Sequence, residues 1–125
     1  MTYSPIVSEH FLHPRNAGEM ESPDVVGQAG SPGQGEFVVI QLRLEGDRIT
    51  QARFQTFGCG PAIAACSVLT EWLTGKTVEE AKDMDGQRLV ELLGGLPADK
   101  VFCAELAISA LRDALGKIEE SDGPG

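Results

Sequence analysis

The segment Phe37–Phe57, FVVIQLRLEGDRITQARFQTF, decides the fold of this chain. In residues 37–44, apolar side chains recur at every second position, which predicts a strand with one fully apolar face. Gly46-Asp47 supplies a turn, and residues 48–57 form a second predicted strand. We therefore expect a β-hairpin whose apolar face is covered by other elements.

Helices are predicted on both sides of this hairpin. Ser4-Pro5 is typical of a helix start, and glycines follow two of the later helical segments. Thr77-Val78-Glu79-Glu80 is a capping box that begins another helix. The predicted helices cover residues 5–12, 61–74, a short segment after the capping box, residues 87–93 and residues 98–118.

The glycine- and proline-rich stretch 14–36 is predicted to be a loop, in which Asp24–Gln28 is a candidate extended segment. Together these elements predict an α+β fold, an antiparallel three-stranded sheet with helices packed on one face. A chain of 125 residues fits one domain, 1–125. Its last residues, 119–125, are expected to be a disordered tail.

Composition excludes several classes of partner. The net charge of −9 argues against nucleic acid and anionic membranes, because both attract positive surfaces. No apolar stretch is long enough for a membrane span, and the N-terminus lacks the regions of a signal peptide. With three cysteines and no disulfide-like spacing, we expect a cytoplasmic, reducing location.

Cys59 lies between two glycines, after a predicted strand and before a predicted helix. Glycines allow a ligand to approach the backbone closely, and a helix N-terminus favours a thiolate, the form that binds metals. A buried structural cysteine in a tight turn explains the same pattern equally well.

The other chemically interesting residues also have simple structural alternatives. Cys103 lies near the start of the last helix on an alanine-rich face, which suits a small core residue, a closely packed backbone or a cofactor. Cys66 fits as core filler in a buried helix. Glu36 follows a glycine-rich loop, where it is either a metal ligand or a solvated charge.

Several segments together resemble the IscU/NifU N-terminal scaffold family. His13–Gly18 resembles its [HN]PRNxG element, and Ala52–Gly60 resembles the segment that holds its second cysteine. Leu96–Lys100, followed by Cys103, is similar to its chaperone-recognised loop and third-cysteine segment. The resemblance covers residues 3–118, and the combined pattern is highly specific.

The resemblance implies an iron–sulfur cluster assembly scaffold rather than an enzyme. In that family a cysteine desulfurase delivers sulfur, and a [2Fe–2S] cluster is built on three cysteines and an aspartate or histidine. By resemblance, Cys59 and Cys103 bind the cofactor, and Cys103 is also the sulfur acceptor. An Hsp70-type chaperone would bind at Leu96–Lys100.

This chain departs from the family pattern at three positions. Gln34 stands in place of the first cysteine, Glu36 in place of the aspartate, and Phe102 in place of the histidine. Because clusters prefer thiolate ligands, the remaining donors Glu36, Cys59 and Cys103 suit a Zn or Fe ion, or a labile [2Fe–2S] cluster. The alternative is a non-catalytic interaction protein of the same fold that has lost cluster binding.

Overall fold

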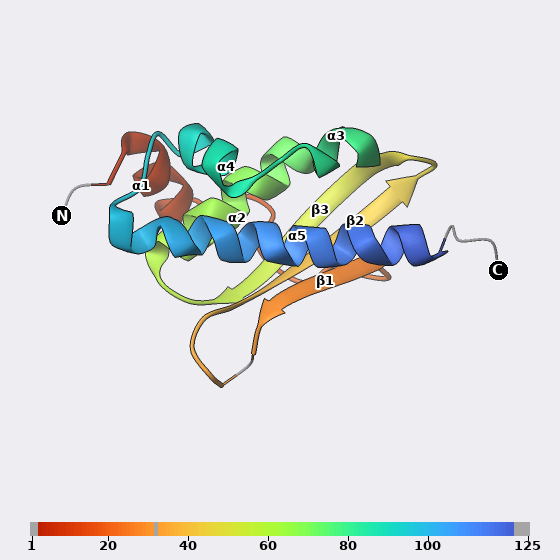
Figure 1. Ribbon diagram of the computed structural model, residues 1–125, viewed down its shortest axis with the longest axis horizontal. Helices are drawn as coiled ribbons and strands as arrows, with labels where there is room; N and C mark the ends of the chain where they lie inside the picture. The colour runs from red at the N-terminus through yellow and green to blue at the C-terminus, as the bar shows by residue number, and fades with distance from the viewer. Residues whose placement is uncertain (1–2, 32, 122–125) are drawn as a thin grey trace.

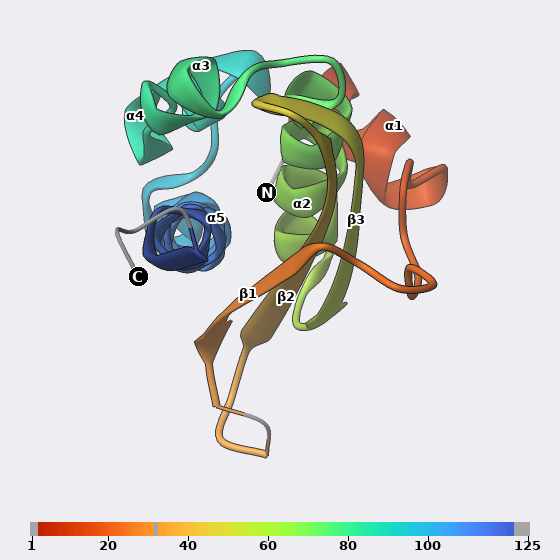
Figure 2. The ribbon, with the colours of Figure 1, turned by 90° about the vertical axis from the view of Figure 1, so that its right-hand side faces the viewer.

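A computed structural model describes residues 3–31 and 33–121 of the chain. Figure 1 shows the long helix α5 running across the sheet, and Figure 2 shows α2 between α5 and β3. The element order is α1 (Pro5–Leu12), β1 (Val25–Gly30), β2 (Phe37–Glu45), β3 (Arg48–Phe57), α2 (Gly60–Leu73), α3 (Val78–Lys82), α4 (Gly86–Leu92), η1 (Ala98–Lys100) and α5 (Val101–Ser121).

The three strands form one antiparallel sheet in the order β1-β2-β3. The predicted hairpin is confirmed, and Phe37 pairs with Phe57 at its open end. One face of the sheet carries buried side chains, Val38, Ile40, Leu42, Ala52 and Phe54. This face packs against the helices, so the predicted fold class is confirmed.

Close packing between β1 and α5 explains the alanine-rich face of the last helix. A Cβ atom built on Gly27 would lie 2.2 Å from the Ala110 carbonyl oxygen and 2.4 Å from the Ala114 nitrogen. Only glycine on the strand and small residues on the helix allow this approach. Close backbone packing therefore accounts for the small residues at Ala110 and Ala114.

The strand β1 is longer than the candidate extended segment Asp24–Gln28. It begins at Val25 and continues to Gly30, where it pairs with Phe37. Its glycines and alanine are poor strand formers. The length of β1 is therefore set by hydrogen-bonded pairing with β2 and not by the strand propensity of its residues.

The last helix continues beyond its predicted end. α5 reaches Ser121, so residues 119–121 are helical and the prediction of a disordered tail is wrong for them; residues 122–125 lie outside the described range. Lys117 Nζ donates to the Val26 carbonyl at 2.8 Å and pairs with Asp113 at 3.1 Å. The Lys117 hydrogen bond attaches this part of α5 to β1.

The His13–Gly18 element covers the free edge of β3. Ala17 forms a parallel bridge with Phe54, and the Phe54 N–H donates to the Asn16 carbonyl at 3.0 Å. The Gly18 N–H donates to the Phe54 carbonyl at 2.9 Å. Capping an exposed strand edge in this way prevents pairing with another chain.

The shorter helices also match their sequence signals. Both halves of the capping box form at Thr77 and Glu80, and Ser4 accepts a hydrogen bond from the Val7 N–H. Cys66 is fully buried within α2, as expected of a core residue. Among the described residues, no helix is both long and apolar enough to cross a bilayer.

Candidate metal centre

Three chain segments meet where Glu36, Cys59 and Cys103 lie. Glu36 directly precedes β2, and Cys59 follows β3 as the N-cap residue of α2. The antiparallel pairing of Phe37 with Phe57 brings these two residues to the same end of the hairpin. Cys103 lies in the first turn of α5, which packs beside α2.

The donor atoms of these residues form a compact group. The Sγ atoms of Cys59 and Cys103 are 3.5 Å apart, and one ligand atom from each of the three residues lies within 4.8 Å of the others. These distances suit a common cation, because Zn–S and Zn–O bonds are about 2.3 and 2.0–2.2 Å long.

One oxygen of the Glu36 carboxylate has no partner in the described part of the chain. The Oε1 atom accepts a hydrogen bond from the Cys59 backbone N–H at 2.8 Å. The Oε2 atom is buried and has no hydrogen-bond donor among the described residues. A buried carboxylate oxygen without a donor is costly, and a bound cation would satisfy it.

Without a cation, the environment of Cys103 favours its protonated thiol. Burial raises the pKa of Cys103 to about 12, with further contributions from the hydrogen bond and charge of Cys59 and from the charge of Glu36. Lys100 opposes this shift. A divalent cation would reverse the balance, because it stabilises adjacent thiolates and a carboxylate together.

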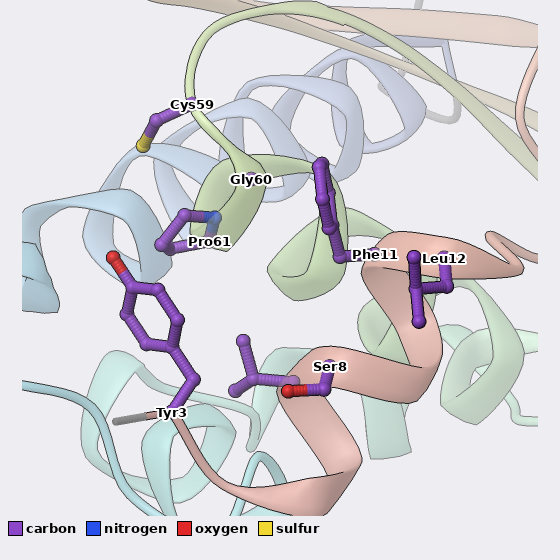
Figure 3. Close-up of a pocket in the computed structure, with 8 residues that line it drawn as sticks. Tyr3, Ser8, Phe11, Leu12, Cys59, Gly60 and Pro61 are labelled. Carbon is purple, nitrogen blue, oxygen red and sulfur yellow. The ribbon is translucent and has the colours of Figure 1, made fainter. Parts of the chain in front are cut away.

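The two cysteines differ in exposure. Cys103, the sulfur acceptor implied by the resemblance, is fully buried. Cys59 is half-buried and adjoins a cavity of about 460 Å³. Figure 3 shows this cavity, which is lined by Tyr3, Val7, Ser8, Phe11, Leu12, Cys59, Gly60 and Pro61.

Packing explains why glycine flanks Cys59 on both sides. A Cβ atom on Gly58 would lie 2.8 Å from Glu36 Oε1, and one on Gly60 would lie 3.0 Å from the Phe11 ring. The first glycine therefore leaves room for the carboxylate, and the second leaves room for α1.

Two of the three substituted family positions, Gln34 and Phe102, face solvent. Gln34 is exposed in the turn between β1 and β2, and Phe102 is 48 % exposed beside Cys103. Among the histidine, cysteine and acidic side chains of the described residues, only Glu36, Cys59 and Cys103 form such a group. The centre therefore offers two thiols and one carboxylate, the donor set expected from the sequence.

An aromatic surface next to the centre was not foreseen from the sequence. Phe57 is 72 % exposed and its ring stacks on that of Phe37 at 5.8 Å. The alternating pattern of β3 could have indicated that Phe57 points away from the core, since Phe54 and Ala52 point into it.

The chain matches known proteins over nearly its whole length. The NifU-like N terminal domain family matches residues 2–123. The chain is 45 % identical to iron–sulfur cluster assembly scaffold protein IscU 1 of Archaeoglobus fulgidus over 113 residues, which cover 90 % of this chain and 74 % of that protein.

Two further relatives extend the comparison. The IscU scaffold protein of Azotobacter vinelandii is 38 % identical, with 98 % of each chain covered. The crystal structure of a putative scaffold protein for the SUF system from Fervidobacterium islandicum AW-1 has a TM-score of 0.73 at 22 % identity, covering 90 % of this chain and 96 % of that one, and shows the same fold. This chain belongs to the NifU-like N-terminal domain family.

Proposed function

We propose that this protein is an iron–sulfur cluster assembly scaffold that carries a metal ion or a labile cluster at Glu36, Cys59 and Cys103. The cargo is passed on rather than kept. The family membership and the relatives named as scaffold proteins support the general role. The observation that carries the proposal is the group of three donors within 4.8 Å, with one orphaned carboxylate oxygen.

The donor set suits a single divalent ion better than a permanent cluster. Two thiolates and a carboxylate fill three positions of a tetrahedral Zn²⁺ or Fe²⁺ site, and a fourth position stays open to water or another ligand. A [2Fe–2S] cluster prefers four thiolates, so we expect it to be labile on one chain.

A cysteine desulfurase is the proposed sulfur donor, with Cys103 as the sulfur acceptor. Because the Cys103 thiol is buried, this role requires that docking of the desulfurase uncovers it. An Hsp70-type chaperone is the proposed partner at Leu96–Lys100, where Ala98 and Asp99 are exposed.

Anaerobic titration with Co²⁺ and Zn²⁺ tests the proposed metal centre. We expect one ion per chain and the absorption band of cobalt–thiolate bonds, with binding greatly weakened in Cys59→Ser and Cys103→Ser. Cys66→Ala is the matched control, because Cys66 is buried nearby but lies outside the donor group. Equal binding by all variants would refute the assignment.

Desulfurase assays separate this proposal from the interaction-protein alternative. A scaffold should gain a persulfide at Cys103 when a desulfurase and cysteine are supplied, and Cys103→Ser should not. An interaction protein would bind the same partner in both forms, gain no sulfur and hold no metal. Mass spectrometry of the labelled protein distinguishes the two.

A further inference from the structure

We propose that Cys59 and Cys103 form a reversible disulfide that closes the metal centre under oxidising conditions. The inference rests on the proposed function in one respect, because the disulfide acts on the same site that would bind metal. Formation of the disulfide itself does not depend on metal binding, so the two can be tested separately.

The separation of the two sulfur atoms supports direct bond formation. They lie 3.5 Å apart, and a disulfide bond is about 2.05 Å long, so an approach of about 1.5 Å is needed. Cys59 lies in a turn between two glycines, whereas Cys103 is held in a helix. The turn that carries Cys59 is therefore the part of the centre most able to move.

The difference in exposure sets the order of the reaction. Cys59 is half-buried beside an open cavity, so a small oxidant such as hydrogen peroxide reaches it first. The Cys59 sulfur attacks one peroxide oxygen, the O–O bond breaks, and a sulfenic acid and one water form. The Cys103 sulfur then attacks the Cys59 sulfur, the S–O bond breaks, and the Cys103 thiol proton leaves with the hydroxyl group as a second water.

The overall reaction is balanced by the peroxide alone. Two thiols lose two protons and two electrons, and the peroxide takes up both to give two waters. A dithiol or phosphine reductant reverses the change. Burial of Cys103 directly behind Cys59 makes it the resolving thiol, and Cys66 does not join the group of donors in the described chain.

The glutamine at position 34 leaves the centre with no sulfur ligand once the disulfide has formed. Because Gln34 has no thiol, a single Cys59–Cys103 bond removes every sulfur ligand that the centre offers. Only the Glu36 carboxylate would remain, and one carboxylate is too weak to hold Zn²⁺ or Fe²⁺. Metal binding and disulfide formation are therefore mutually exclusive, and bound metal protects both thiols.

Peroxide treatment of the reduced, metal-free protein tests disulfide formation. We expect the intact mass to fall by two hydrogen atoms and alkylatable cysteines to fall from three to one, with Cys66 the residue that still reacts after unfolding. Peptide mapping should recover a Cys59–Cys103 cross-link. Cys66→Ala should form it equally well, and Cys59→Ser should not.

A second measurement tests the effect on the metal centre. The oxidised protein should lose the cobalt–thiolate absorption band, and phosphine reduction should restore it. Protein loaded with Zn²⁺ before peroxide is added should keep its thiols. Oxygen addition at Cys59 without a cross-link, or a disulfide between two chains, would overturn the proposal, as would a cross-linked protein that still shows the cobalt–thiolate band.

The experiments distinguish a wrong metal assignment from a wrong disulfide assignment. If the reduced protein binds no Co²⁺ but peroxide still joins Cys59 to Cys103, the metal assignment is wrong and the disulfide stands. If Co²⁺ binds and no cross-link forms, the metal assignment stands and the disulfide is refuted.

Discussion

The backbone N–H of Cys59 donates a hydrogen bond to Glu36 Oε1 at 2.8 Å, so one proposed ligand holds the turn that carries another. This bond uses one carboxylate oxygen and leaves the other, Oε2, buried and without a donor among the described residues. Glu36 therefore has two separable roles: it positions the turn with one oxygen and offers the other to a cation.

Glu36→Gln should separate these two roles. The glutamine amide oxygen can still accept the Cys59 N–H, but the neutral side chain is a weaker metal ligand. We expect Co²⁺ or Zn²⁺ affinity to fall about tenfold or more, with the free energy of unfolding of the metal-free protein nearly unchanged. Glu36→Ala, which also loses the hydrogen bond, should in addition lower that free energy by about 1 kcal/mol. Unchanged affinity in Glu36→Gln would remove Glu36 from the ligand set.

Restoring the family's ligands should strengthen cluster binding. Gln34→Cys combined with Phe102→His adds a thiolate and an imidazole at the two exposed positions where the family resemblance places ligands, and both are better ligands for iron than the residues they replace. After anaerobic reconstitution with iron and sulfide, the double variant should retain more cluster, measured as visible absorption per chain. Gln34→Ser with Phe102→Leu is the control and should retain no more than the parent. Equal retention by both variants would mean that residues 33–36 do not face the metal.

Two glycines that pack against or within α5 should respond oppositely to alanine. Gly27→Ala forces a Cβ to within 2.2 Å of the Ala110 carbonyl oxygen, so we expect the free energy of unfolding to fall by about 1–3 kcal/mol. Gly116 lies in α5, and apart from its chain neighbours and the adjacent backbone of α5 a Cβ there meets no atom of the described residues within 4 Å. Gly116→Ala should raise the free energy of unfolding by about 0.5–1 kcal/mol. Urea denaturation measures both, and a neutral Gly27→Ala would contradict the close packing of β1 on α5.

Acid should destabilise the protein through His10. This side chain is buried and its Nδ1 lies 2.7 Å from Ser67 Oγ. Burial lowers the pKa of His10 below 6.5, and the charge of Arg15 lowers it further, so the unfolded chain binds a proton that the folded chain resists. As pH falls below 6.5, the free energy of unfolding should fall, by at most about 1.4 kcal/mol per pH unit, until the folded histidine is also protonated.

A neighbouring histidine provides the control for this pH effect. His10→Gln should flatten the loss of stability between about pH 6.5 and 5, whereas His13→Gln, at an exposed position, should leave it unchanged. Denaturation curves measured at several pH values give the comparison. The same slope in wild type and His10→Gln would exclude His10 as its cause.

Local signals in the sequence accounted for most of the secondary structure. Alternation in residues 37–44 predicted β2, and the capping box at Thr77 and Glu80 predicted α3, because both signals act between residues close in sequence. The strand β1 was harder to delimit, since Gly27 and Gly30 have no strand preference and are extended only by pairing with β2.

The candidate site, too, could be predicted only in part from the sequence. In the structure, the pairing of Phe37 with Phe57 brings Glu36 and Cys59 to one end of the sheet, and the packing of α5 brings in Cys103, which is 44 residues from Cys59. Family resemblance supplied Cys103 as a ligand candidate. Its distance from Cys59 became known only from the tertiary structure.

By itself, the sequence determined the hairpin, most of the helices and the fold class, because residue type and short-range periodicity encode them, whereas the three candidate donors came from the family resemblance. Tertiary packing alone decided that α5 lies close on Gly27, that Cys103 is buried behind Cys59, and that Glu36 keeps one oxygen without a donor in the described structure. These features depend on how helix and sheet surfaces fit together, and that fit is settled by contacts between residues far apart in the chain.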